Sequence, residues 1–151
     1  MTLTELVLAA QAVSSAAMCG LIWFVQIVHY PLFARVEGDS SQEFADENQA
    51  RTGPVVIPFM LVEGLTAAII AWSPPPGVPR SVAIAGLGAV IAIWLSTACV
   101  QMPLHARLSR EGHSAAAVAA LVRSNWLRTL LWSARAGLAV WMIFAAARHA
   151  A

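Results

Sequence analysis

Four long apolar runs, separated by polar or proline-rich stretches, constrain this chain more than any other feature. The first run, residues 6–33, contains no Asp, Glu, Lys or Arg, and residues 54–72, 81–102 and 125–147 form the other three. A helix needs roughly 20 mostly apolar residues to cross a bilayer. Only 11% of the 151 residues are charged, against roughly a quarter in a soluble domain. The sequence therefore predicts a single-domain, all-α integral membrane protein, an up-down-up-down bundle of four transmembrane helices.

The stretches between these runs predict how the spans are connected. Residues 73–79 read Ser-Pro-Pro-Pro-Gly-Val-Pro, which predicts a tight turn. Residues 34–53 and 104–124 are longer and polar, and we expect them to form two loops on the opposite side of the membrane. In the second of these we expect an Ala-rich helical piece from Ser114.

Several residues at the span ends carry more specific expectations. The Ser-Ser-Gln-Glu sequence at 40–43 has the spacing of a capping box and predicts a short surface helix over 41–51. We expect Pro54 to begin the second span, because proline is favoured at the first helical position. Pro58 should bend that span, and Pro103 should close or kink the third.

The distribution of arginine predicts the orientation. Five arginines lie in the two longer loops, at positions 35, 51, 107, 110 and 123, whereas only Arg80 and Arg148 lie on the other side. Because cytoplasmic loops carry the excess of positive charge, the longer loops should face the cytoplasm of a bacterial inner membrane. Both termini should then lie on the non-cytoplasmic side.

Composition also limits the partners of the chain. A net charge of +1 offers no basic stripe for nucleic acid, so the lipid bilayer is the expected partner. Cys19 and Cys99 lie in apolar runs and predict packing residues. The small residues Ala85, Gly88, Ala89 and Ala92 share one helical face, which would suit a homo-oligomer. No dinucleotide-binding glycine motif, P-loop or Ser-His-Asp pattern is present, and the sequence identifies no cofactor.

Polar residues recur at helical spacing inside all four runs. They are Ser15, Cys19, Gln26 and His29 in the first run, Glu63 and Thr66 in the second, Thr97, Gln101 and His105 in the third, and Asn125, Arg128, Trp132 and Arg135 in the fourth. Residues three or four apart share one face of a helix, and polar groups avoid lipid. The four stripes therefore predict one shared polar interior.

Two charged residues in this interior should lie at the same depth. Glu63 and Arg135 are each about nine or ten residues from the longer-loop side, or roughly 13–15 Å deep. Because an isolated charge there would be severely destabilising, we expect the two side chains to form an intramembrane ion pair. The pair could serve function, or it could only fix the register of the helices.

Nearer the longer loops, a second group of polar residues has the side chains that chemistry requires. The candidate catalytic residues are His29, His105 and Arg128, and the candidate ligand-binding residues are Gln26, Tyr30, Gln101, Asn125 and Trp132. A histidine can act as a base and an arginine can hold a developing oxyanion. His29 and His105 are also candidate metal ligands, although no metal-binding spacing supports this. Alternatively, both are ordinary residues of the membrane interface, and His113 and His149 are exposed.

The stretch Trp23-Phe24-Val25-Gln26-Ile27-Val28-His29-Tyr30-Pro31-Leu32-Phe33 resembles the first-span signature of a family of small bacterial membrane proteins. This family is grouped with the anthrone-oxygenase-like domain of unknown function. Three further stretches carry the resemblance, around Pro54–Glu63, Ser96–His105 and Asn125–Arg135, so that it covers nearly the whole chain.

The resemblance implies a four-helix membrane protein with shared polar positions and, in some members, oxidation of polycyclic anthrones to quinones. These positions would be His29, Glu63, His105, Asn125, Arg128 and Arg135. One departure concerns the first loop, where the family would place histidines shortly before Arg51. This chain has Asp46-Glu47-Asn48 there instead, which weakens the oxygenase interpretation.

Three hypotheses for function follow. The first is a site for a small apolar or aromatic compound, open to the cytoplasmic leaflet beneath the acidic loop, with an oxidoreductase as the enzymatic form. The second is a small transporter or proton relay using Glu63, Arg135 and the histidines. The third is a structural or accessory subunit whose polar core serves assembly.

Overall fold

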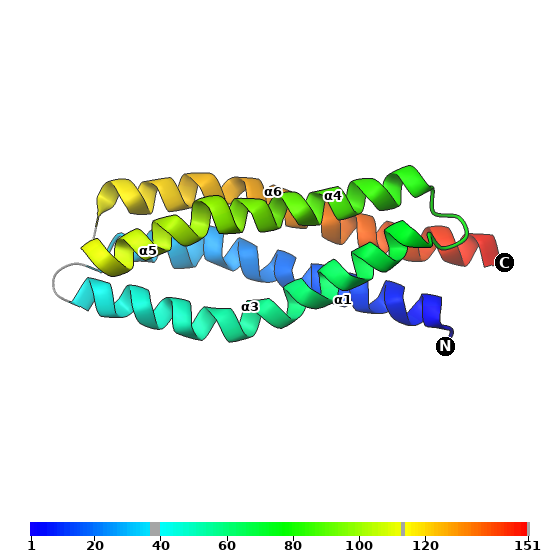
Figure 1. The fold of residues 1–151 in the computed structure, drawn as a ribbon, viewed down its shortest axis with the longest axis horizontal. Helices are drawn as coiled ribbons and strands as arrows, with labels where there is room; N and C mark the ends of the chain where they lie inside the picture. Colours follow the sequence, from blue (N-terminus) through cyan, green and yellow to red (C-terminus); the bar gives the residue numbers. More distant parts are fainter. Residues whose placement is uncertain (37–39, 113, 151) are drawn as a thin grey trace.

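The computed structural model describes residues 1–36, 40–112 and 114–150, without the Ala150 side chain, and it is all-α. Four helical rods cross from end to end (Figure 1). They are α1 (Leu3–Phe24) continued by η1 (Val25–His29) and α2 (Tyr30–Phe33), then α3 (Ser40–Trp72), then α4 (Arg80–Ser96) continued by η2 (Thr97–Gln101) and α5 (Met102–Glu111), and finally α6 (Ala115–Ala150). Each rod is long and apolar enough to span a membrane, which confirms the predicted four-helix membrane bundle.

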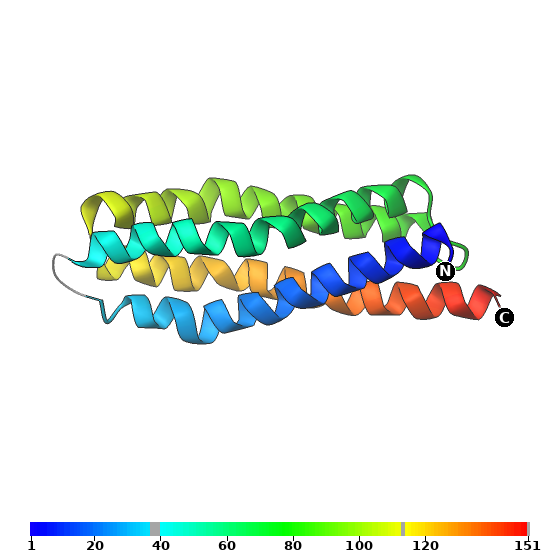
Figure 2. The same cartoon turned by 90° about the horizontal axis from the view of Figure 1, so that it is seen from below.

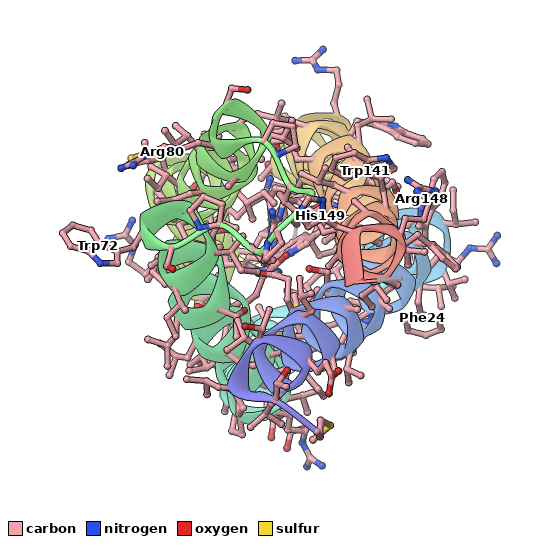
Figure 3. The ribbon with its side chains drawn as sticks, turned by 90° about the vertical axis from the view of Figure 1, so that its right-hand side faces the viewer. Phe24, Trp72, Arg80, Trp141, Arg148 and His149 are labelled. Atoms are coloured by element: carbon pink, nitrogen blue, oxygen red, sulfur yellow. The ribbon has the colours of Figure 1, made fainter. Side chains whose placement is uncertain are left out.

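The rods form a closed ring when viewed along the bundle axis (Figure 3). The α1 rod packs between α3 and α6, and α4 also packs between α3 and α6. Consequently α3 lies diagonally opposite α6, and α1 lies diagonally opposite α4. Both termini and the Pro-rich turn lie at one end, which we term the terminus end (Figures 1 and 2). The other two connections lie at the opposite end, which we term the connection end.

The distribution of side chains is the reverse of that in a soluble bundle. Large apolar residues face outward, among them Trp72 at 84% and Leu65 at 65% exposure, and Figure 3 shows Phe24 and Trp72 pointing away from the ring. Polar residues such as Glu63 and Asn125 are completely buried. This arrangement suits a hydrocarbon surrounding, in which apolar groups face lipid and polar groups must find partners inside.

The helices are longer than the apolar runs, and the two connections expected over 34–53 and 104–124 are helical over most of their described residues. Helix α3 begins at Ser40, so that the expected surface helix over 41–51 and the second span are one continuous helix. The third rod continues to Glu111, and α6 begins at Ala115. Apolar packing explains the extensions, because Ala45, Leu108 and Leu121 form a buried cluster at the connection end that keeps these segments helical beyond the apolar runs.

Four prolines lie inside the rods. Pro54 lies in the interior of α3, as does Pro58, so the expected helix start at Pro54 was wrong. Pro31 and Pro103 each follow a π-helical turn, in which the N–H groups of Tyr30 and Met102 bond five residues back to the carbonyls of Val25 and Thr97. Proline lacks an N–H and crowds the carbonyl four residues earlier, and a π-turn accommodates both effects. The third rod is therefore not closed at Pro103.

Three apolar clusters fill the interior at successive levels. The terminus-end cluster contains Leu8, Ile70, Val78, Ala83, Met142 and Ala145. The middle cluster contains Met18, Ile22, Ile93 and Trp132. The connection-end cluster contains Tyr30, Phe33, Ala45, Leu108, Ala117, Val118 and Leu121. Between these clusters lie the polar groups that make up the candidate site.

Candidate functional site

A buried carboxylate stands at the centre of the bundle. Ser15 Oγ donates a 2.7 Å hydrogen bond to Glu63 Oε1, and Trp132 Nε1 donates a 2.9 Å bond to Oε2. Arg135 Nε lies 3.4 Å from Oε1, and both charged side chains are almost fully buried. The structure thus contains the predicted Glu63–Arg135 ion pair. Because α3 and α6 lie diagonally opposite each other, the ion pair joins these two helices across the bundle axis.

Further hydrogen bonds extend this group toward the terminus end. Gln11 Nε2 donates to Ser15 Oγ at 2.9 Å, and Thr66 Oγ1 lies 3.0 Å from Gln11 Oε1. On the other side of Arg135, a Cβ atom added to Gly86 would lie only 2.6 Å from Arg135 Nη1. The absence of a side chain at Gly86 therefore makes room for the guanidinium. We call this group of six side chains, Gln11, Ser15, Glu63, Thr66, Trp132 and Arg135, the central network.

Trp132 connects the central network to a second group of polar residues. Its indole N–H bonds Glu63, and its ring lies 5.2 Å from the guanidinium carbon of Arg128. Such a distance is typical of a cation–π contact. In the other direction Arg128 interacts with the hydroxyl of Tyr30, and Tyr30 Oη lies 3.1 Å from His105 Nε2. A continuous chain of contacts therefore runs from mid-bundle to the connection end.

Tyr30 and His105 meet across the bundle. They come from the first and third rods, which lie diagonally opposite each other. Tyr30 directly follows the first π-turn, and His105 lies one helical turn after the second. Their rings lie 5.6 Å apart, and the Phe33 ring lies edge-on against Tyr30. The two π-turns, which begin at Val25 and Thr97, thus set the rotation of the segments that bring Tyr30 and His105 together.

The second histidine has a separate partner. His29 Nε2 shares a 2.7 Å hydrogen bond with Asn48 Oδ1, which also accepts from Thr52 Oγ1 at 3.3 Å. Asn48 belongs to the Asp46-Glu47-Asn48 stretch before Arg51, and its amide lies beside His29. Within the described part of the chain, no three His, Cys, Asp or Glu side chains gather in a possible metal site.

The amide of Asn125 is oriented by a backbone carbonyl. Gln26 Nε2 donates to the Val122 carbonyl at 3.1 Å, which leaves Gln26 Oε1 to accept from Asn125 Nδ2 at 2.9 Å. Because the Asn125 side-chain nitrogen donates this bond, the side-chain oxygen must be the amide atom that points away from Gln26. Asn125 Oδ1 is buried and has no hydrogen-bond partner within the described protein.

The same reasoning applies to Gln101. Ser124 Oγ donates to the Ala120 carbonyl at 2.6 Å and therefore accepts from Gln101 Nε2 at 2.9 Å. Gln101 Oε1 is then a buried acceptor without a partner in the described residues. The backbone thus fixes which atom of each amide stays free.

Unpartnered buried atoms are concentrated at this level of the bundle. Among described side chains, five buried nitrogen or oxygen atoms have no partner: Gln101 Oε1, His105 Nδ1, Asn125 Oδ1, Arg128 Nε and Arg135 Nη2. The first four belong to the second group, which we call the connection-side layer and define as Gln26, Tyr30, Gln101, His105, Asn125 and Arg128. Buried polar groups in proteins are nearly always hydrogen-bonded, so four such atoms together indicate an unsatisfied site.

The predicted site residues thus lie in the central network, in the connection-side layer and, for His29, in a separate contact with Asn48. Trp132 joins the central network and His29 forms its own contact with Asn48, whereas the other candidates meet in the connection-side layer. Sequence reasoning did not assign Asn48, Ser124 or Thr66 to these contacts. Ser15 and Thr66 were already placed on the polar faces by their spacing, but spacing alone did not identify Glu63 and Gln11 as their partners.

Charged residues near the connection end lie on the outside of the helices. Asp46 and Glu47 are exposed on α3, and Arg51 Nη2 lies 3.3 Å from Glu47 Oε1 on the same helix. The predicted acidic loop over the site is therefore, in its described part, a helical surface. His149 is exposed at the other end, whereas His113, Glu37 and Asp39 lie outside the described residues. Cys19 and Cys99 are free thiols.

Comparison with known proteins adds no assignment to this geometry. No protein-family model, curated protein or solved structure matches the chain. The anthrone-oxygenase-like resemblance therefore stays a prediction, and the family of the chain is not assigned.

Proposed function

We propose that the connection-side layer binds a small, largely apolar compound that carries oxygen atoms. The observation that carries this proposal is the gathering of four unpartnered buried polar atoms in that layer. A ligand that supplies their hydrogen bonds would recover a free energy of about 1–3 kcal/mol for each unsatisfied group. The apolar clusters on both sides of the layer favour a flat aromatic body.

The free atoms define the chemistry of this compound. Gln101 Oε1 and Asn125 Oδ1 only accept hydrogen bonds, whereas Arg128 Nε only donates one. His105 Nδ1 can do either, because its role depends on whether Nε2 accepts from or donates to Tyr30 Oη. A matching ligand needs both carbonyl and hydroxyl groups. A hydroxylated quinone or anthrone has this combination on an apolar frame.

In its enzymatic form, the site would oxidise an anthrone with dioxygen. A histidine, His105 or His29, would accept a proton from the CH₂ group opposite the carbonyl, and Arg128 would stabilise the oxygen as it gains negative charge. One oxygen atom of dioxygen would enter the new carbonyl. The other would leave as water, together with the two hydrogen atoms of the CH₂ group. Binding is the primary proposal, and this chemistry depends on it.

The orientation that we propose places the connection end in the cytoplasm of a bacterial inner membrane. The support is the count of five arginines at that end against Arg80 and Arg148 at the other. The site would then be close to the inner leaflet.

An accessory role is the second candidate. A Cβ atom added to Gly88 would meet nothing within 4 Å, and Ala85 beside it is exposed, so this small-residue face of α4 is free to pack against another helix. A homo-oligomer or a larger complex would use that face. The transport hypothesis has less support, because a packed apolar cluster fills the interior at the terminus end.

A binding measurement tests the proposal. Purified protein in lipid nanodiscs is titrated with 2,6-dihydroxyanthraquinone, with anthracene as the oxygen-free control, and quenching of tryptophan fluorescence reports occupancy. We expect tighter binding of the quinone, and Arg128→Met should weaken it about tenfold or more, since a hydrogen bond to a charged group contributes about 1.5–3 kcal/mol. The matched control is Arg148→Met, an exposed arginine at the other end of the same helix. Equal affinity for quinone and anthracene would contradict the proposal.

A further inference from the structure

A groove on the outer surface leads to the edge of the connection-side layer. It has a volume of about 500 Å³ and lies between the third and fourth rods. Its lining consists of Cys99, Val100, Pro103, Leu104, Ala120, Arg123 and Ser124. Ser124 is both a wall of this groove and the hydrogen-bond partner of Gln101, whose free Oε1 belongs to the proposed site. The Gln101–Ser124 hydrogen bond therefore joins the wall of the groove to a residue of the connection-side layer.

Access along the bundle axis is closed at both ends by packed side chains. The connection-end cluster lies above the layer, with Leu121 and Phe33 buried to 0% and 4% exposure. The middle cluster lies below it, where Met18 and Trp132 are completely buried. A ligand that reached the layer along the axis would have to displace one of these clusters.

The wall of the groove is also the place where the third rod departs from regular helix. Cys99 and Val100 belong to the π-turn Thr97–Gln101, and Pro103 lies two residues after its end. A π-turn replaces the regular hydrogen bonds to the carbonyl four residues back with bonds to the carbonyl five residues back, and proline removes a donor. Bending of the rod at this point costs fewer backbone hydrogen bonds than bending elsewhere. It would move Gln101, which sits at the end of the turn, away from Ser124.

We propose that the groove between the third and fourth rods is a lateral portal, through which a bilayer-dissolved, oxygen-bearing aromatic compound enters the connection-side layer. The Gln101–Ser124 hydrogen bond is its gate, and the π-turn at 97–101 is the hinge that opens it. The inference rests on the proposed binding function and adds the route and the phase from which the ligand comes. Gln101 would then serve both parts, because its Nε2 forms the gate and its Oε1 is a free acceptor of the layer.

Two substitutions on adjacent residues of α6 test the portal. Ala120→Trp fills this groove, whereas Ala119→Trp places the same indole in a groove on the other side of α6, beside Pro31 and Trp126. Binding of 2,6-dihydroxyanthraquinone in nanodiscs is followed by stopped-flow fluorescence. We expect Ala120→Trp to slow both association and dissociation by about tenfold, which corresponds to an entry barrier higher by about 1.4 kcal/mol. Because both rates fall equally, the Kd should not change. Ala119→Trp should keep the wild-type rates.

The exposed thiol of Cys99 gives a second measurement that does not depend on a substitution in the groove. In a Cys19→Ala background, labelling Cys99 with N-benzylmaleimide should slow both rates in the same way, and the Cys19→Ala/Cys99→Ala protein treated identically should not respond. Wild-type rates in both blocked proteins, or equal slowing by both tryptophans, would overturn the portal while leaving the binding site intact. A wild-type protein that does not prefer the quinone over anthracene would overturn the binding function and the portal together.

Discussion

At the scale of single residues, the Glu63 carboxylate is the group whose partners matter most to the bundle. A buried charge is tolerated only when hydrogen bonds and an opposite charge replace its hydration. Glu63 receives hydrogen bonds from Ser15 and Trp132 and the ion pair from Arg135. The pair joins α3 to α6 diagonally across the bundle, so its loss would leave the Trp132–Glu63 hydrogen bond as a remaining side-chain link between these two helices.

A double-mutant cycle measures how far the stability of the buried Glu63 carboxylate depends on Arg135. Arg135→Met should lower the free energy of unfolding by about 3–5 kcal/mol, because it leaves Glu63 charged and buried without its counter-ion. The double variant Glu63→Gln/Arg135→Met should lose clearly less than the sum of the two single losses, since it leaves no uncompensated charge. Unfolding in mixed detergent micelles, followed by circular dichroism, gives the three values. Additive losses would show that the two residues act independently.

Prediction from sequence reached this pair because depth can be counted along a helix. Glu63 and Arg135 lie at equal distances from the connection side, and hydrocarbon leaves each few other partners. The donors Ser15 and Trp132 could not be ranked in the same way, because their contacts depend on how far each helix rotates about its axis. Asn48 was missed for a different reason: it lies in a segment that the sequence predicts as a separate surface helix, whereas in the structure this segment is the beginning of α3.

At the scale of secondary structure, the two π-turns decide which side chains meet at the connection end. A π-turn accommodates one more residue than the α-helical path between the same flanking segments. In the first rod it lies at Val25–His29, directly before Tyr30 and Pro31. Removal of one residue from the turn, together with the proline that accompanies it, should therefore restore a regular helix without rotating its two flanks.

Deletion of Ile27 combined with Pro31→Ala should therefore be tolerated. Ile27 is 56% exposed, so its loss removes no core contact, and we expect a stability loss of at most about 1–2 kcal/mol. The matched control deletes Ala16, an exposed residue in the regular part of α1, which would turn one flank by about 100°. Thermal unfolding and size-exclusion chromatography in detergent distinguish the two. If both deletions unfold the protein equally, the π-turn is not an insertion of this kind.

The apolar runs predicted the number and order of the rods, but not their ends. Hydropathy reports the length that lies in hydrocarbon, about 30 Å, whereas the 33 residues of α3 extend to about 50 Å. Beyond the hydrocarbon, the helices continue because Ala45, Leu108 and Ala117 pack against one another. Ala45 and Leu108 stand among charged neighbours in the sequence, and the apolar stretch around Ala117 is too short to span a membrane, so their packing becomes visible only once the four rods are assembled.

At the scale of the whole molecule, the bundle has a recognisable position along the membrane normal. Arg123 and Arg148 are 25 residues apart on α6 (148 minus 123), or about 37 Å, which is slightly more than the hydrocarbon thickness. Trp23 and Trp126 pack edge-to-face with ring centroids 5.7 Å apart at one level, and Figure 3 shows Trp72, Trp141 and Arg148 pointing outward from the bundle. Both levels suit the headgroup regions, where tryptophan and arginine are favoured.

The remaining property of the whole molecule is which of its two ends faces the cytoplasm, and arginine distribution predicts the connection end. In a bacterial host, a C-terminal alkaline phosphatase fusion should be active and a C-terminal green fluorescent protein fusion dark, because the terminus lies outside. The same reporters inserted after Gly112 should behave in the opposite way.

Replacing Arg107, Arg110 and Arg123 by Gln lowers the arginine count at the connection end from five to two (5 − 3 = 2), equal to the two at the terminus end. Since the positive-charge difference sets the orientation, this variant should insert in both directions and give partial activity with both C-terminal reporters. The matched control, Glu43→Gln/Asp46→Asn/Glu47→Gln, changes as many charges at the same end and should keep the wild-type pattern, because acidic residues contribute little to orientation. A fluorescent, phosphatase-inactive C-terminus in the wild-type chain would reverse the proposed orientation and move the ligand site to the outer leaflet.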